Sequence, residues 1–247
     1  MFDIRKFANT LASGLRKFLR LFVVHLDRES IARMYIKGKG IEIGALHTPL
    51  RVSKSVQVTY LDRMSIPELR KQYPELNSKN LVPIDIIDDG EKLSKIADAT
   101  QDFVIANHFL EHCQNPIGTI ENILRVLKKD GILYLSIPDK RFSFDKDRPV
   151  TSIEHLLRDY SDGPDWSKRE HFEEWTKYVG MIKDATEREQ QVRSLMHSDY
   201  SIHYHAWAQT EIIELILIMK KRLNFEFEVE LLVTHDEEVI AILKKNA

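Results

Sequence analysis

Apolar positions along the chain follow two different periods, and together these predict an α/β fold. Alternating or continuously apolar runs at residues 41–43, 56–62, 101–106, 132–137, 225–233 and 239–243 are typical of strands. Residues 115–129 have apolar side chains at helical spacing, with Asn115 as N-cap, Pro116 in the first turn and Lys128 and Lys129 in the last turn. A second apolar helix is predicted to start at a Thr210 cap and to end at residues 220–222.

Three further segments complete the predicted order of elements. Residues 81–85 predict a strand at the edge of the sheet, because Pro83 cannot donate to a ladder. Residues 2–34 predict one or two amphipathic helices. These either lie across the sheet, close the cofactor pocket, or bind a membrane surface through a basic, Phe- and Leu-rich face. Residues 140–208 are rich in charge, His and Trp, and predict a largely helical insertion after the fifth strand.

Composition narrows the class of protein. The chain has 247 residues, 43% hydrophobic and 30% charged, which is enough for one well-buried domain with an insertion. A net charge of −2 provides no general basic field for nucleic acid, so we expect no nucleic-acid partner. Cys113 is the single cysteine, which excludes an internal disulfide. With no apolar run long enough for a membrane span and no secretory signal, we expect a cytoplasmic protein, either free or peripheral to the inner face of the membrane.

A glycine loop after the first strand indicates the ligand. Glu42 lies inside the strand and Gly44 ends it, where a missing Cβ lets a ligand approach the backbone. A dinucleotide site needs further glycines, whereas an acidic residue with a single glycine suits a ligand that has a cationic end and no phosphate, such as S-adenosyl-L-methionine (SAM). Asp62, at the end of the second strand, can accept hydrogen bonds from ribose hydroxyls of either NAD or SAM.

These residues carry a family resemblance. Glu42-Ile43-Gly44 resembles the first motif of class I SAM-dependent methyltransferases, E/D-x-G-x-G, although the second glycine falls on Leu46. Residues 102–141 are similar to bacterial methyltransferase-domain proteins associated with glycan pathways. The similarity lies in the run D-F-V-I-A-N-H-F-L-E-H and in the N-P-I, R-V-L-K and L-Y-L-S-I-P-D-K-R that follow it.

The resemblance implies a Rossmann-like, seven-stranded, mostly parallel sheet of order 3-2-1-4-5-7-6, with the last strand antiparallel and helices on both faces. It also implies that Asp85 or the Ile86 backbone meets the adenine. The residues expected to bind SAM are Glu42, Gly44, Ala45, Asp62, Arg63, Asp85, Ile86, Asn107 and His108.

Three groups of residues compete for the catalytic role. His108, Glu111 and His112 would share one helix face just after strand four, as hydrogen-bond partners behind the reacting groups or as ligands of a divalent ion. Asp139 ends strand five and faces either the acceptor or the neighbouring Lys140 and Arg141.

The third group lies in the insertion. If residues 201–207 are extended, His203, His205 and Trp207 share one face, which would provide a sugar-stacking surface with a base or a metal-ligand pair. His155 and His171 belong to the same insertion. The catalytic candidates are therefore His203, His205, Asp139 and His108, and no metal is assigned.

The sequence therefore predicts a methyltransferase domain at residues 37–247, preceded by a helical segment at residues 1–36 and carrying an acceptor-binding lid at residues 140–208. We expect transfer of a methyl group from SAM to a small polar acceptor, such as a carbohydrate hydroxyl. The alternatives are a lipid-linked acceptor at a membrane surface and a catalytically silent SAM-binding regulatory or scaffold protein.

Overall fold

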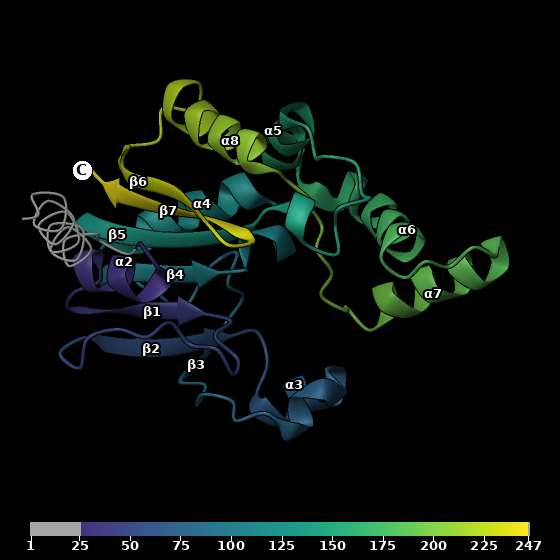
Figure 1. The fold of residues 1–247 in the computed structure, drawn as a ribbon, viewed down its shortest axis with the longest axis horizontal. Coiled ribbons are helices and arrows are strands. Elements are labelled where there is room, and N and C mark those ends of the chain that lie inside the picture. The colour runs from purple at the N-terminus through teal and green to yellow at the C-terminus, as the bar shows by residue number, and fades with distance from the viewer. Residues whose placement is uncertain (1–25, 247) are drawn as a thin grey trace, which may run out of the picture.

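A seven-stranded sheet organises the computed structural model, which describes residues 26–246 (Figure 1). Its strand order is β3-β2-β1-β4-β5-β7-β6, as the resemblance implied. The strands span Lys39–Ile43 (β1), Gln57–Asp62 (β2), Ile86–Ile87 (β3), Gln101–Asn107 (β4), Leu127–Pro138 (β5), Phe227–His235 (β6) and Glu238–Lys245 (β7). Strands β1 to β5 pair in parallel, whereas β7 runs antiparallel to both β5 and β6.

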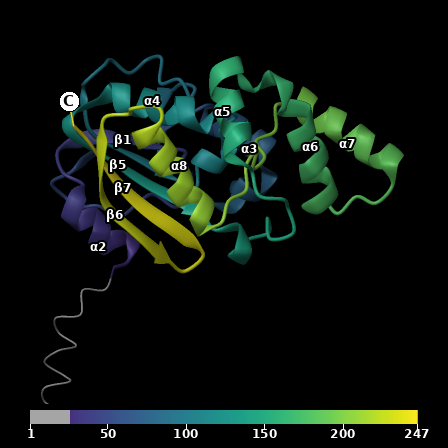
Figure 2. The ribbon, with the colours of Figure 1, turned by 90° about the horizontal axis from the view of Figure 1, so that it is seen from above.

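Alternation along the central strands divides the core between the two faces of the sheet. On β4, Phe103 and Ile105 face helix α2 (Arg28–Tyr35), while Val104 and Ala106 face the cluster built by α4, α5 and α8. Helices α4 (Pro116–Val126), α5 (Ile153–Asp162) and α8 (Gln209–Lys221) thus lie on the face opposite α2 (Figure 2). Strand β4 is therefore covered on both faces, as its apolar centre predicted.

Helix α4 has the predicted start but an earlier end. The Asn115 side chain accepts a hydrogen bond from the Gly118 N–H at 2.9 Å, which confirms the N-cap. The helix stops at Val126, and Leu127 already pairs with Gln101 of β4, so the prediction that Lys128 and Lys129 form the last helical turn is wrong.

The third strand is also shorter and later than predicted. The Asp85 N–H donates to the Tyr60 carbonyl, and the Asp85 carboxylate accepts from the Tyr60 N–H, both at 2.9 Å. Regular pairing with β2 therefore begins only at Ile86. The segment does lie at the sheet edge, as the missing N–H of Pro83 predicted.

The insertion, residues 140–208, leaves the sheet after β5 and returns at α8. It contains α5, α6 (Lys168–Tyr178) and α7 (Ala185–His197), with short 3₁₀ turns at Lys140–Phe142 and Pro164–Trp166. Its outer part has an apolar cluster of its own, formed by Phe172, Val192, Ile202 and Tyr204. The predicted Thr210 cap of α8 is wrong, because the N-cap is Ala208, two residues earlier, and Thr210 already lies inside the helix. The Ala208 N–H donates to the Glu211 carboxylate at 3.0 Å.

Helix α3 (Ile66–Gln72) and a 3₁₀ turn at Pro74–Ser78 follow β2. At the N-terminal end of the described chain, α2 buries Ile31 and Ala32 against the sheet, as expected of a helix lying across it. The membrane-binding alternative depends mainly on residues 1–25, which lie outside the described part. Among residues 26–246, no helix combines the length and apolar character that crossing a bilayer requires.

Candidate active site

A cavity of about 690 Å³ opens at the carboxyl ends of the parallel strands. The arrowheads of these strands point toward α3 on one side and the insertion on the other (Figure 1). The two walls meet at Arg63, whose guanidinium donates to the Asp199 carbonyl at 3.0 Å, and at Gln72, whose amide donates to the Ser198 carbonyl at 3.0 Å. The carboxyl ends of the strands, α3 and the insertion therefore enclose one site.

The loop after β1 keeps a left-handed backbone at both motif positions. Gly44 has φ +65°, and a Cβ built on it would meet no atom within 4 Å, so this side of the glycine is open to a ligand. Leu46, which stands where the family motif has its second glycine, has φ +50°. The loop thus adopts at Leu46 the conformation that glycine favours, even though the glycine is absent.

Glu42 lies beneath this loop and does not line the cavity. Its Oε1 accepts a hydrogen bond from the Leu50 N–H at 2.8 Å, while its Oε2 has no partner. Burial raises the pKa of this carboxyl to about 7, against the opposing effects of the Leu50 N–H and the Asn107 side chain. Glu42 therefore supports the loop from within.

The predicted cofactor residues divide into two sets. Gly44, Asp62, Arg63 and His108 line the cavity, together with Asp89 and Gly90, which the sequence reading had not singled out. The other predicted residues do not line it: Glu42, Ala45, Asp85, Ile86 and Asn107. Asp62 is nearly buried, and this burial raises the pKa of its carboxyl, while the backbone N–H groups of Met64 and Arg63 oppose the shift.

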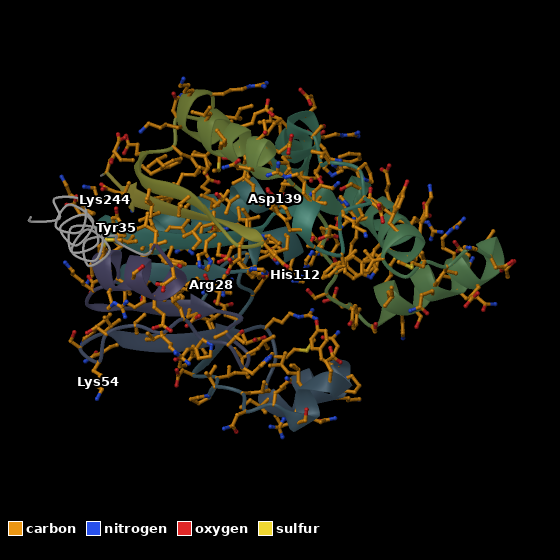
Figure 3. All side chains as sticks on the ribbon, in the orientation of Figure 1. Arg28, Tyr35, Lys54, His112, Asp139 and Lys244 are labelled. Atoms are coloured by element: carbon orange, nitrogen blue, oxygen red, sulfur yellow. The ribbon has the colours of Figure 1, made fainter. Side chains whose placement is uncertain are left out.

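His108 belongs to an ionic network at the ends of β4 and β7. Its Nε2 lies 2.8 Å from Glu238 Oε2, and the Arg28 Nε donates to Glu238 Oε1 at 2.6 Å. Burial opposes ionisation of Glu238, but hydrogen bonds from Arg28, His108 and Ser136 outweigh it and hold the pKa of this carboxyl well below its usual range. Arg28 thus reaches from α2 toward the strand ends (Figure 3).

His203, in the part of the cavity wall that the insertion forms, pairs with an aspartate. His203 Nδ1 lies 2.6 Å from Asp145 Oδ2, and Arg148 holds the other oxygen of the same carboxylate at 2.8 Å. Burial opposes ionisation of Asp145, whereas His203 and Arg148 lower its pKa and keep it charged. A charged Asp145 fixes the ring and tautomer of His203, so that Nε2 is the nitrogen left for other partners.

Glu111 and His112 lie next to His203. Glu111 is fully buried, both of its carboxylate oxygens lack a hydrogen-bond partner, and Oε1 lies 4.0 Å from His203 Nε2. His112 Nδ1 lies 2.9 Å from the Ile202 carbonyl, and burial lowers the pKa of this imidazole to about 3. Glu111, His112 and His203 bring one ligand atom each within 4.8 Å of one another, which is one arrangement that could hold a metal ion.

The prediction that His108, Glu111 and His112 share one face of a helix is wrong. His108 has φ +46° and precedes the 3₁₀ turn at Leu110–His112, so it does not share a helix with the other two residues. The residues are nevertheless close, because His108 Nδ1 lies 3.8 Å from Glu111 Oε1.

The structure separates the other two catalytic candidates from the cavity. Asp139 is buried at the start of the 3₁₀ turn Lys140–Phe142, and Arg141 Nη2 donates to its Oδ2 at 2.6 Å. His205 is fully buried and stacks on Trp207 with ring centroids 5.4 Å apart. Neither Asp139 nor His205 lines the cavity, whereas His203 and His112 do.

Sequence reasoning missed several residues that line this end of the site. Phe144 and Trp175 line the cavity beside His203, with ring centroids 4.7 and 5.7 Å from its imidazole. The pairing of Asp145 with His203 was not predicted, because no periodicity connects the two residues across the insertion. An Asp–His pair of this kind is visible only when the insertion is folded.

Comparisons with known proteins give a matching family model and matching solved structures, but no matching curated protein. A comparison with the sequences of curated proteins finds no significant match. Among solved structures, the SAM-dependent methyltransferase from Methanosarcina mazei is 18% identical, with 87% of this chain and 95% of that chain covered and a TM-score of 0.42.

Two carbon methyltransferase structures match with longer chains. The CurJ carbon methyltransferase is 10% identical, with 86% of this chain and 50% of that chain covered and a TM-score of 0.46. The DszA carbon methyltransferase is 15% identical, with 98% and 54% covered and a TM-score of 0.41. The present chain thus spans about half the length of either.

The family assignment rests on the sequence itself. The family model of the methyltransferase domain matches residues 38–187, which include the glycine loop, strands β1 to β5 and the helices that follow. The chain belongs to the methyltransferase-domain family, and its cofactor is S-adenosyl-L-methionine.

Proposed function

We propose that this protein methylates a hydroxyl group of a small polar acceptor, with a carbohydrate or a related metabolite as the best candidate. The observation that carries the proposal is the buried His203–Asp145 pair at the cavity wall, with Nδ1 and Oδ2 2.6 Å apart. An imidazole oriented by a carboxylate is a suitable general base for a hydroxyl, which is a poor nucleophile until its proton is removed.

The residues present fit SAM at the other end of the cavity. The open side of Gly44 leaves room for a ligand against the backbone, and the nearly buried Asp62 carboxylate supplies acceptors for ribose hydroxyls. Asp89 and Gly90, after β3, line the same region. When bound, SAM supplies an electrophilic methyl group on a sulfonium centre.

The protein's own contribution to the reaction is position, desolvation and a proton acceptor. The contacts of Arg63 and Gln72 with Ser198 and Asp199 bring α3 and the insertion together over the cavity, which limits access of water. His203 Nε2 would accept the acceptor proton, and Asp145 would stabilise the imidazolium that forms.

A sugar as acceptor is favoured by the aromatic side chains beside this base. Phe144 is 55% exposed and faces His203, and Trp175 packs edge-on against the Phe144 ring with centroids 5.6 Å apart. Apolar ring faces beside a hydrogen-bonding group provide the apolar and polar contacts that a pyranose needs. Residues 140–208 would then form the acceptor-binding lid.

The test combines cofactor binding with turnover. Purified protein is assayed for S-adenosylhomocysteine release with SAM and a panel of monosaccharides and nucleotide sugars, beside amine and thiol acceptors. We expect turnover with a hydroxyl acceptor, and His203→Gln should lower kcat by about 10²–10⁴-fold without weakening S-adenosylhomocysteine binding. His197→Gln, at an exposed histidine of α7, is the matched control and should behave as wild type.

Three outcomes would contradict the proposal. Turnover of amines or carbon acceptors alone would reject the hydroxyl class. Activity that disappears on chelation and returns with a divalent ion, where His203→Gln removes that ion from the protein, would assign His203 to a metal together with Glu111 and His112. Tight binding of S-adenosylhomocysteine without turnover of any fraction of a cell extract would favour the silent SAM-binding protein.

A further inference from the structure

A second group of ionisable side chains lies inside the insertion, away from the cavity. It consists of His155 and Asp159 on α5, His171 on α6 and His205 on the segment that returns to α8. Each residue brings one ligand atom to within 4.8 Å of the others, and none of the four lines the cavity. Asp159 and His205 are fully buried, and His171 is 7% exposed.

The distances within this group approach those of a tetrahedral metal centre. His155 Nε2 lies 3.1 Å from His171 Nε2 and 3.2 Å from Asp159 Oδ2, while His205 Nε2 lies 3.9 Å from the same Asp159 oxygen. Zinc bonds of about 2.0–2.1 Å in a tetrahedron separate the ligand atoms by about 3.3 Å. The nitrogens and the oxygen therefore surround a volume of the right size for one ion.

Hydrogen bonds alone leave this group unsatisfied. The Asp159 Oδ2 and the His205 Nε2 have no hydrogen-bond partner, although both residues are fully buried. Within the described chain, the ion pairs of Asp159 are with histidines only. A buried carboxylate without a cation is costly, and a single divalent ion would satisfy all four atoms at once.

The Asp159 carboxylate is already oriented by a partner on its far side. The Ser167 hydroxyl donates to Asp159 Oδ1 at 3.1 Å, which leaves Oδ2 toward the centre of the group. Partners of this kind fix the tautomer and direction of metal-binding residues. His155, whose side chain is 19% exposed, lies on the route from solvent.

We propose that His155, Asp159, His171 and His205 bind a structural Zn²⁺ ion that joins α5, α6 and the returning segment of the insertion. Three imidazoles and one carboxylate at closed, four-coordinate geometry favour zinc over magnesium or calcium, which prefer oxygen ligands. His205 is thereby a metal ligand and not a catalytic residue. Since His203 lies two positions before it, the ion would also fix the segment that holds the proposed base.

The experiment measures zinc in the full-length protein. After equilibration with zinc and removal of free metal, elemental analysis should give one zinc per chain that is lost in His171→Ala and Asp159→Ala. Ser167→Ala should retain the ligands but bind zinc about 10–100-fold more weakly. His197→Ala and Glu111→Gln are the controls, the second because Glu111 belongs to the separate group at the cavity.

A second variant, in which one metal-binding residue is replaced by another, distinguishes loss of the metal site from misfolding. His171→Cys should still bind cobalt in a tetrahedral site and add a thiolate-to-cobalt absorption band that the wild type lacks. The proposal is overturned if the wild type contains no zinc, if His171→Ala contains as much as wild type, or if the loss follows Glu111→Gln instead. Metal content is read without any methyl acceptor, so this result is independent of the proposed reaction.

Discussion

Replacing Glu42 by glutamine should stabilise the folded protein in a pH-dependent manner. Burial raises the pKa of this carboxyl from an ordinary 4.5 to about 7. The folded state therefore holds a proton that the unfolded chain has released, and stability falls as the pH rises from about 4.5 through 7. At about 1.4 kcal/mol per pH unit, the loss at pH 8 amounts to about 3 kcal/mol.

The Glu42→Gln variant would not lose stability as the pH rises, because a carboxamide does not ionise, and it would preserve the local contacts. A carboxamide oxygen can still accept the hydrogen bond from the Leu50 N–H, and its NH₂ group replaces the proton on Oε2. The difference in free energy of unfolding between Glu42→Gln and wild type should be small near pH 4.5 and should grow to about 3 kcal/mol at pH 8.

Urea denaturation at several pH values measures this difference, because the other titrating groups cancel between the two proteins. Glu214→Gln, at an exposed position of α8, is the control and should show no pH-dependent difference. A difference for Glu42→Gln that stays flat between pH 4.5 and 8, or a variant less stable than wild type at pH 8, would refute the reasoning.

Three further variants test other features. Gly44→Ala should fold with a loss of about 1 kcal/mol for its positive φ, yet titration calorimetry should show weaker S-adenosylhomocysteine binding; unchanged affinity would place the ligand elsewhere. Gly40→Ala should destabilise by at least about 2 kcal/mol in urea, because its Cβ would lie 2.1 Å from the Phe103 carbonyl of β4; a neutral effect would contradict the strand register. Arg28→Ala should cost about 3 kcal/mol by leaving Glu238 buried without its cation, and Glu238→Gln in the same chain should recover part of it; equal instability of single and double variants would contradict the pairing.

Most strands could be predicted because each carries its own hydrophobic pattern, whereas the order of the strands in the sheet came from the family resemblance. The apolar centre of β4 and the Asn115 cap of α4 are local signals, and both are confirmed. The exceptions have local causes as well: the third strand starts late because Asp85 hydrogen-bonds to Tyr60. The pairing of Asp139 with Arg141 was among the open alternatives, since the two residues are neighbours in the chain.

The site in the insertion was less predictable because it depends on contacts between distant segments. His203 and His205 were expected on one face of an extended segment, but residues 201–208 form no strand. His203 pairs with Asp145 in the cavity wall, while His205 lies beside His155 and His171. To predict that His203 and His205 have different partners, one must know how three distant segments pack together. The spacing of residues along the chain does not carry this information.

The separate apolar cluster of the insertion has a consequence for how this protein can diverge. Phe172, Val192, Ile202 and Tyr204 pack on one another and not on the sheet core, so substitutions around them leave the packing of β1 to β5 undisturbed. A lineage can therefore remodel Phe144 and Trp175, the proposed contacts of the acceptor, while the glycine loop and Asp62 stay as they are. This architecture therefore allows selection to produce relatives that keep the same SAM-binding residues and act on different substrates.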